Sequence, residues 1–204
     1  MVHADASNFA SGVTKEEAYE QVLMQAEGIF DGQRNWHLVG PPIYSVTHSL
    51  TPILPSNLAN ASSLLWHAYH SLPSPSNSVN WAGFYVLDPL STPSKPSLIL
   101  GPFMGKVACQ TIRFGRGVCG AAAASRETQL VPDVDAFPGH IACDGDSRSE
   151  VVVPVVVPAA EGEDGSDRLV AIIDVDCTLP GGFDDVDRVW LEKFAALLSK
   201  SCDW

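Results

Sequence analysis

Two runs of β-branched residues near the C-terminus constrain the fold of this chain most strongly. Residues 150–158 (EVVVPVVVP) and 168–176 (RLVAIIDVD) are dense in valine and isoleucine. Such residues favour strands, because their branched side chains pack well on a pleated surface. The acidic, glycine-containing segment EGEDGSD lies between the two runs and predicts a turn. The chain therefore contains a sheet, and its other segments must supply more strands and the helices that cover it.

The rest of the chain predicts further strands and four helices. Strands are expected over residues 79–87, which are aromatic and β-branched, over residues 97–102, and over residues 106–114, where Val107, Cys109 and Thr111 alternate. Helical spacing of apolar residues predicts a helix that opens with a capping box from Thr14 to Glu17, and helices over residues 57–72, 118–126 and 183–200. This order favours an α+β fold, in which an antiparallel sheet carries the terminal helices on one face.

The composition favours a single globular protein of the cytoplasm. Of the 204 residues, 46% are hydrophobic and 18% are charged, which is enough to bury a core. A formal net charge of −12 argues against nucleic acid or an anionic membrane as a partner. No apolar run approaches the roughly 20 residues that span a bilayer, and no secretory signal is visible at the N-terminus. We therefore expect a cytoplasmic protein, with the nucleus as the alternative, whose five cysteines are thiols.

One domain over residues 14–204 accounts for all the predicted elements, and residues 1–13 are expected to form a flexible leader. Residues 37–56 differ from their surroundings. They contain Pro41, Pro42, Pro52 and Pro55, and they follow neither a helical nor a strand period. We interpret this segment as an irregular loop inserted into the domain.

Three of the cysteines lie in one stretch that lacks the pattern of a metal site. Cys109, Cys119 and Cys143 form no C-x-x-C pair, and no histidine stands at metal-ligand spacing from them. We therefore expect no metal and no cofactor. Two interpretations remain, which are buried core cysteines and a redox relay. Cys143 is the strongest single candidate for a reactive thiol, because it lies in a polar loop rather than in an apolar run.

The charges around Cys143 act in opposite directions. The neighbouring carboxylates of Asp144 and Asp146 raise the pKa of a thiol, whereas the guanidinium of Arg148 lowers it. A sulfenic-acid cycle tolerates this balance better than acyl transfer does, because a carboxylic acid can protonate a sulfoxide oxygen as its bond to sulfur breaks.

Two further pairs of residues share one face of their strands. Asp174 and Asp176 are two residues apart, so both carboxylates point to the same side of the sheet. They face either solvent or a polar site in which one pKa is raised. Trp81 and Tyr85 are four residues apart in the 79–87 strand. They form either the wall of a small pocket or part of an aromatic core.

The chain resembles the free methionine-(R)-sulfoxide reductases, which are single GAF domains. The resemblance covers the first helix and then the chain from Asn57 to the C-terminal helix. It is carried by the motifs NLANASSLL, NWAGFYV, LGPFMGKVACQTIRFGRGVCG, HIACDGDSRSEVVVPV, IIDVD and FDDVD. The resemblance implies a GAF-like antiparallel sheet of about six strands and the reduction of the R epimer of free methionine sulfoxide. It also implies thioredoxin as the reductant, and a homodimer paired through the terminal helices as one form of assembly.

The resemblance implies a role for each candidate residue as well. Cys143 matches the cysteine that attacks the sulfoxide and becomes a sulfenic acid, Cys109 matches the resolving cysteine that forms a disulfide with it, and Cys119 matches an auxiliary cysteine. Three carboxylates and two aromatic residues match substrate-binding positions: Glu150, Asp174, Asp176, Trp81 and Tyr85. Two questions stay open, namely which carboxylate donates the proton and whether Cys119 replaces Cys109 as the resolving thiol.

The chain departs from this family at residues 37–56, because members usually pass from the first helix to the NLAN motif within a few residues. We interpret the extra segment as an extruded loop or as the translation of a retained intron. Two rival functions also remain, which are a GAF sensor that binds a small ligand and a thiol-based redox sensor.

Overall fold

The computed structural model describes residues 9, 12–32, 34, 57–139, 144–159 and 167–204. Six strands form one antiparallel sheet in the order β3-β2-β1-β6-β5-β4. The strands are β1 (Val79–Leu87), β2 (Ser97–Gly105), β3 (Thr111–Arg113), β4 (Gln129–Val131), β5 (Ser149–Val157) and β6 (Arg168–Cys177). The predicted insertion at residues 37–56 and most of the predicted leader lie outside the described residues.

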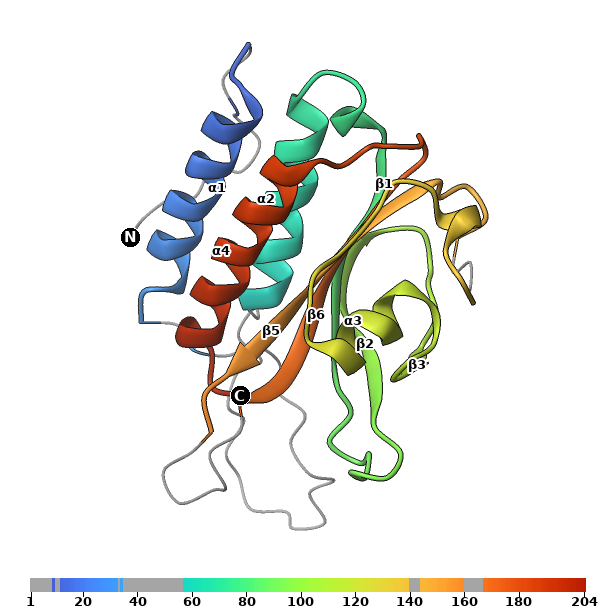
Figure 1. Cartoon of the computed structure of the whole chain (residues 1–204). Coiled ribbons are helices and arrows are strands. Elements are labelled where there is room, and N and C mark those ends of the chain that lie inside the picture. Colours follow the sequence, from blue (N-terminus) through green and yellow to red (C-terminus); the bar gives the residue numbers. More distant parts are fainter. Residues whose placement is uncertain (1–8, 10–11, 33, 35–56, 140–143, 160–166) are drawn as a thin grey trace.

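Three helices cover one face of the sheet, and one shorter helix covers the other. The helices α1 (Lys15–Phe30), α2 (Asn57–Ser71) and α4 (Asp185–Ser201) lie side by side, and α3 (Gly117–Ser125) lies across the sheet from them (Figure 1). This arrangement confirms the predicted α+β fold with the terminal helices together on one face. In the part of the chain that the structure describes, no helix is both long enough and apolar enough to cross a membrane.

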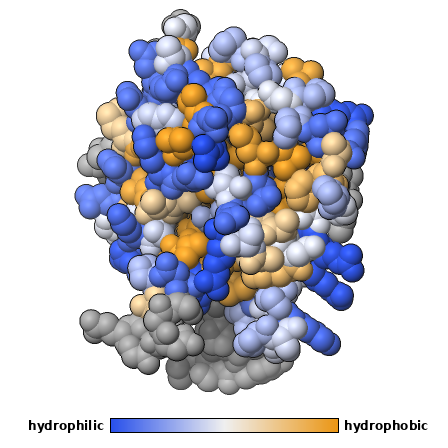
Figure 2. Space-filling view, viewed as in Figure 1, coloured by the Kyte–Doolittle hydropathy of each residue, from blue (hydrophilic) through white to orange (hydrophobic). Residues whose placement is uncertain are grey.

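Both faces of the sheet are buried, which explains the density of β-branched residues in β5 and β6. In β5, Val151, Val153 and Val155 belong to the larger core beneath the three helices, whereas Val152 belongs to a smaller core beneath α3. A strand that is buried on both sides needs apolar residues at nearly every position. On the outer side of the helices, hydrophobic side chains lie among hydrophilic ones (Figure 2).

The strand predicted over residues 106–114 is much shorter in the structure. Only Thr111–Arg113 is a strand, so the prediction that Cys109 lies in an alternating strand was wrong. The preceding strand β2 instead extends to Gly105, which has a φ of 126°, and there the chain leaves the sheet. A side chain at Gly105 would place its Cβ 2.6 Å from the backbone oxygen of Asn80, so this turn depends on glycine. Cys109 therefore lies in a loop.

A buried polar network joins the three helices of the larger layer around Asp187, in the first turn of α4. The Asp187 side chain is fully buried. It accepts hydrogen bonds from Tyr19 of α1 at 2.9 Å and Tyr69 of α2 at 3.3 Å, and it forms an ion pair with Lys15 of α1 at 2.7 Å. The hydroxyl groups of Tyr19 and Tyr69 also hydrogen-bond each other. One carboxylate thus satisfies polar groups from two other helices.

Replacing Asp187 with alanine is expected to lower the free energy of unfolding by about 3 kcal/mol or more. The substitution removes the carboxylate acceptor of two buried tyrosine hydroxyls, and it leaves the Lys15 ammonium with Asp184 as its remaining partner at 2.9 Å. Urea denaturation followed by circular dichroism measures the change. Asp185→Ala is the matched control in the same helical turn, because the Asp185 side chain is 81% exposed; we expect it to change stability by less than about 0.5 kcal/mol. Equal losses in both variants would contradict a stabilising role of the network.

Candidate active site

A cavity of about 300 Å³ opens on the side of the sheet that α3 covers. Its walls come from the N-terminal turn of α3, from the segment that contains β3, and from neighbouring ends of β5 and β6. Five of the residues that the sequence singled out line it: Cys109, Cys119, Glu150, Asp174 and Asp176. The fold therefore brings together groups that are up to 67 positions apart in the sequence.

The register of β5 against β6 places the three carboxyl groups on one face. Glu150 pairs directly with Asp176 of β6. Asp174 precedes Asp176 by two residues, so its side chain points to the same side of the sheet. Glu150 and Asp174 are only 6% and 5% exposed. Asp176 is half-buried, and both aspartates line the cavity, so the pair faces a polar site rather than open solvent, which decides between the alternatives that the sequence left open.

Burial raises the pKa of all three carboxyl groups, and repulsion by Asp174 adds to the effect for the other two. Burial raises the pKa of Asp174 to about 6. Burial, followed by the charge of Asp174, raises the pKa of Glu150 and of Asp176 well above the ordinary range. Three carboxyl groups clustered in this way cannot all be ionised at neutral pH without a cation nearby, so the cluster retains protons.

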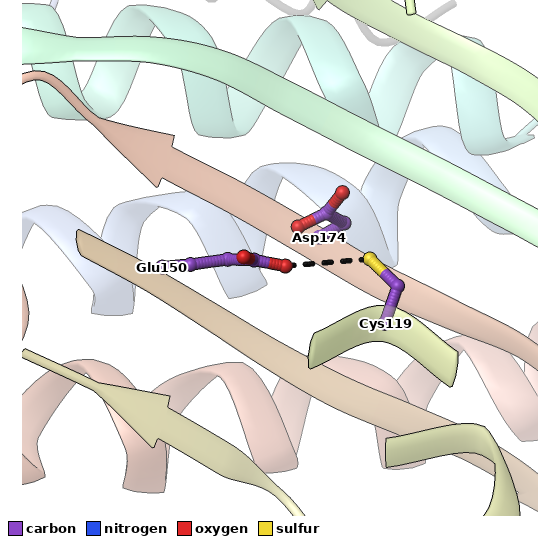
Figure 3. A group of neighbouring side chains, drawn as sticks. All are labelled: Cys119, Glu150 and Asp174. Carbon is purple, nitrogen blue, oxygen red and sulfur yellow. Dashed lines mark hydrogen bonds between the residues drawn. The ribbon is translucent and has the colours of Figure 1, made fainter. Parts of the chain in front are cut away.

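Cys119 joins this acidic cluster from the first turn of α3. Its Sγ donates a hydrogen bond to Oε1 of Glu150 over 3.4 Å (Figure 3). Burial raises the pKa of the Cys119 thiol well above its ordinary value, and the charges of Asp174 and Glu150 add to the effect. Cys119 is therefore a protonated hydrogen-bond donor at neutral pH, and it is a weak nucleophile.

Cys109 lines the cavity from its loop and is disulfide-bonded. The cysteines Cys119, Cys177 and Cys202 are free thiols. Cys143, the strongest candidate of the sequence analysis, lies outside the described residues. The structure therefore confirms that Cys109 and Cys119 share one cavity, and it leaves the role of Cys143 as a prediction.

Trp81 and Tyr85 stack on each other, with ring centroids 5.8 Å apart, and so share a face of β1 as predicted. Both are almost fully buried in the smaller core, where Trp81 also stacks on Phe103. Neither is among the described residues that line the cavity. Tyr85 nevertheless lies close to the acidic cluster, since burial and then the charge of Asp174 raise the pKa of its hydroxyl. The two rings therefore lie beside the cluster on the neighbouring strand, where Trp81 pairs with Asp176.

The rim of the cavity contains polar residues that the sequence analysis did not select. Asn80 donates hydrogen bonds to Asp144 and to Ser147, each over 3.1 Å, and both acceptors line the cavity. The only signal for Asn80 was its place beside Trp81 in the NWAGFYV motif. The guanidinium groups of Arg113 and Arg116, which flank the turn before α3, also lie on the rim and are exposed.

The carboxylates of Asp144 and Asp146 pair with a cation that the sequence analysis did not select, and the predicted effect of Arg148 on Cys143 lies outside the described residues. Arg148 pairs with Asp135 at 3.2 Å. It is Lys106 that lies 2.5 Å from Asp146 and 3.6 Å from Asp144. The backbone oxygen of Lys106 accepts a hydrogen bond from the indole of Trp81 over 3.1 Å, so β1 holds this residue in place. Sequence distance favoured Arg148, but the turn after β2 brings Lys106 across instead.

Comparisons with known proteins agree with this architecture. The family model for the GAF domain matches residues 57–201. The free methionine-R-sulfoxide reductase of Saccharomyces cerevisiae is 49% identical over 200 residues, which cover 98% of this chain and 94% of that protein. The Escherichia coli protein of the same name is 41% identical over 145 residues, or 71% of this chain and 75% of the relative.

Solved structures show the same similarity. The free methionine-R-sulfoxide reductase from Neisseria meningitidis, solved in complex with its substrate, superposes with a TM-score of 0.72 and 33% identity, covering 96% of this chain and 95% of the other. The substrate complex of the Staphylococcus aureus protein superposes with a TM-score of 0.64 and 32% identity, covering 91% and 95%.

Replacing Asp174 with asparagine is expected to stabilise the protein at neutral pH. Because the pKa of Asp174 is higher in the folded than in the unfolded chain, the folded state loses stability as the pH rises from about 4 to 6, and the whole penalty is present above pH 6. We expect the midpoint of thermal unfolding to rise by about 4 °C at pH 7.5, and the difference to shrink towards pH 4. Differential scanning fluorimetry across this pH range tests the sign.

Asp167→Asn serves as the control for this measurement, because the Asp167 side chain is exposed at the start of β6. We expect that variant to unfold like the wild type at every pH. A lower melting temperature of Asp174→Asn at pH 7.5 would mean that the ionised carboxylate is stabilised by its surroundings, contrary to the geometry of the cluster.

Proposed function

The chain belongs to the free methionine-R-sulfoxide reductases of the GAF-domain family, and we propose that it reduces free L-methionine-(R)-S-oxide to L-methionine through cysteine chemistry. One observation carries the proposal: a single cavity contains three carboxyl groups, a free thiol and a disulfide-bonded cysteine. Reduction of a sulfoxide releases its oxygen as water, and the reaction consumes two electrons and two protons. Thiols can supply the electrons, and protonated carboxyl groups can supply protons.

The distribution of charge supports a free amino acid as the substrate. The floor of the cavity is acidic and suits an α-ammonium group, whereas Arg113 and Arg116 on the rim suit an α-carboxylate. The first turn of α3 offers further hydrogen-bond donors for the α-carboxylate. Its backbone N–H groups receive no side-chain hydrogen bond from Arg116 at the N-cap. A residue within a protein chain carries neither of these two charges, so the cavity favours the free amino acid.

The acidic cluster also supports proton delivery to the sulfoxide oxygen. A group with a pKa near or above neutral can hold a proton in the resting enzyme and release it when the S–O bond weakens. We assign Glu150, Asp174 and Asp176 jointly to this task and to binding of the ammonium group. The cation of the substrate favours ionisation of one carboxyl group while another stays protonated. Trp81 and Tyr85 lie on β1, the strand next to the two aspartates, and we assign them to the methyl end of the substrate.

We assign nucleophilic attack to Cys143. Its sulfur takes the oxygen from the sulfoxide, so that methionine leaves and the cysteine becomes a sulfenic acid. The thiol of Cys109 then attacks the sulfenic sulfur, which forms a disulfide and releases water. The disulfide-bonded state of Cys109 and the free thiols of the other described cysteines support this pairing. The raised pKa of Cys119 argues for an auxiliary role, as a donor to Glu150, rather than for the resolving role.

A dithiol reductant must then restore the two thiols, and we propose thioredoxin in the cytoplasm for this step. Thioredoxin attacks the disulfide with one thiolate and resolves the mixed disulfide with its second, so both electrons leave the reductant and the enzyme returns to its starting state. The low reduction potential of thioredoxin suits it to this task.

We expect thioredoxin-coupled turnover of free L-methionine-(R)-S-oxide by the wild type, and loss of at least about a thousandfold in kcat for Cys143→Ser. Consumption of NADPH in the presence of thioredoxin and its reductase measures the rate. Cys109→Ser should release one equivalent of methionine per enzyme and then stop, because the sulfenic acid has no partner.

Cys202→Ser is the matched control, since this buried thiol lies at the end of α4 and does not line the cavity. It should cycle like the wild type. Normal cycling of Cys109→Ser would instead make Cys119 the resolving thiol, and normal activity of Cys143→Ser would refute the mechanism. Absence of turnover in the wild type would favour a ligand-binding or redox-sensing role.

Blocking the α-ammonium group should nearly abolish the reaction. We expect kcat/KM for N-acetyl-L-methionine-(R)-S-oxide to fall by about a hundredfold or more relative to the free amino acid, because the acidic floor then loses its cation. Methionine release, measured by chromatography, gives both rates. Comparable rates for the two substrates would contradict recognition of the ammonium group by the carboxyl cluster.

A further inference from the structure

Three potential metal ligands converge at the floor of the cavity from three different elements. They are Sγ of Cys119 from α3, a carboxylate oxygen of Glu150 from β5 and one of Asp174 from β6 (Figure 3). The three atoms all lie within 4.8 Å of one another, and all three residues are buried. Their side chains point towards a common space rather than away from one another (Figure 3).

Asp174 supplies an independent sign of a missing ligand. Its Oδ1 atom is buried and has no hydrogen-bond partner among the described residues, although the residue is only 5% exposed. Asp174 lines the cavity. An unsatisfied buried carboxylate oxygen costs about 1–3 kcal/mol or more, so it is expected to face a group that binds there. The substrate's ammonium group is one such partner, and a metal cation is another.

We propose that Cys119, Glu150 and Asp174 form a binding site for a thiophilic divalent cation, with Zn²⁺ as the expected ion, and that the bound ion excludes the substrate. Binding of the ion depends only on the three ligands. The exclusion of substrate rests on the proposed function, because both ligands would occupy the same acidic floor.

The distance between the sulfur and one carboxylate oxygen fits a tetrahedral zinc site. Zn–S and Zn–O bonds of about 2.3 and 2.1 Å at a tetrahedral angle place sulfur and oxygen about 3.6 Å apart. Sγ of Cys119 and Oε1 of Glu150 are separated by 3.4 Å. Three protein ligands with the fourth position open to a cavity of about 300 Å³ correspond to an open zinc site, in which water completes the coordination.

The ligand set selects the type of ion. Mg²⁺ and Ca²⁺ prefer six or more oxygen ligands, whereas a thiolate favours Zn²⁺ and similar ions such as Co²⁺. The ion displaces the thiol proton of Cys119 and the protons shared by the carboxyl groups, and these protons pass to solvent. Arg113 and Arg116 are the cationic residues among the described lining residues, and both lie on the exposed rim, so no described cation occupies the floor.

A cobalt titration of the full-length Cys109→Ser/Cys143→Ser double variant tests the site. This variant cannot turn over, and among the cysteines assigned to the site it retains only Cys119. We expect one equivalent of Co²⁺ to produce a near-ultraviolet band of thiolate-to-cobalt charge transfer, and Zn²⁺ to remove the band by displacement. Absence of the band would overturn the proposal.

Adding Cys119→Ser to the double variant should abolish the band and weaken Zn²⁺ binding by at least about tenfold in calorimetry. Adding Cys202→Ser instead is the matched control and should preserve the band, because Cys202 lies outside the cavity. A band that survives Cys119→Ser, or that disappears with Cys202→Ser, would also overturn the assignment.

Free L-methionine-(R)-S-oxide, added to the cobalt-loaded double variant, should abolish the band if substrate and ion exclude each other. A band that persists at saturating sulfoxide, with a wild type that turns over, would refute the exclusion and leave two separate ligands. An inactive wild type would refute the proposed function, whereas the cobalt band and its loss with Cys119→Ser would still decide the metal site.

Discussion

Burial of the sheet on both faces is the constraint on which the rest of this structure depends. The three long helices cover one face completely, so the chain can place polar chemistry only on the other face, where α3 is short and leaves a cavity beside its first turn. The ends of β5 and β6 lie beside this cavity, and their carboxyl groups therefore enter a space that is largely shielded from bulk water. Enclosure is what raises the pKa of these groups, so that the cluster retains protons closer to neutral pH than exposed carboxyl groups do.

The acidic cluster lowers the stability of the folded state, and the remainder of the fold offsets this loss. Like charges in a buried site destabilise the folded state when they are ionised, and the orphaned oxygen of Asp174 adds to this cost. The opposite layer compensates through a dense core and through the network around Asp187, where one carboxylate is satisfied by partners from α1 and α2. The helical layer thus contains a buried carboxylate with several hydrogen-bond partners, whereas the cavity contains a buried carboxylate oxygen of Asp174 that lacks one among the described residues.

The fold was largely predictable because local patterns and tertiary burial agree. The β-branched runs became β5 and β6, and the capping box at Thr14 begins α1 as expected. The prediction failed over residues 106–114, where period-2 alternation suggested a long strand. There the chain leaves the sheet at Gly105, whose positive φ and close contact with Asn80 depend on the neighbouring strand. Alternation within one segment contains no information on such a contact.

The sequence by itself predicted candidate site residues, and it determined that Asp174 and Asp176 share a face, because a strand has a period of two. Only the tertiary structure decided that Glu150 stands opposite Asp176 and that Cys119 donates to Glu150, because strand register and helix placement are set by packing between distant segments. The same reason explains why metal-ligand spacing along the chain predicted no site. The three potential ligands come from α3, β5 and β6, so their spacing along the chain could not predict that they lie close together.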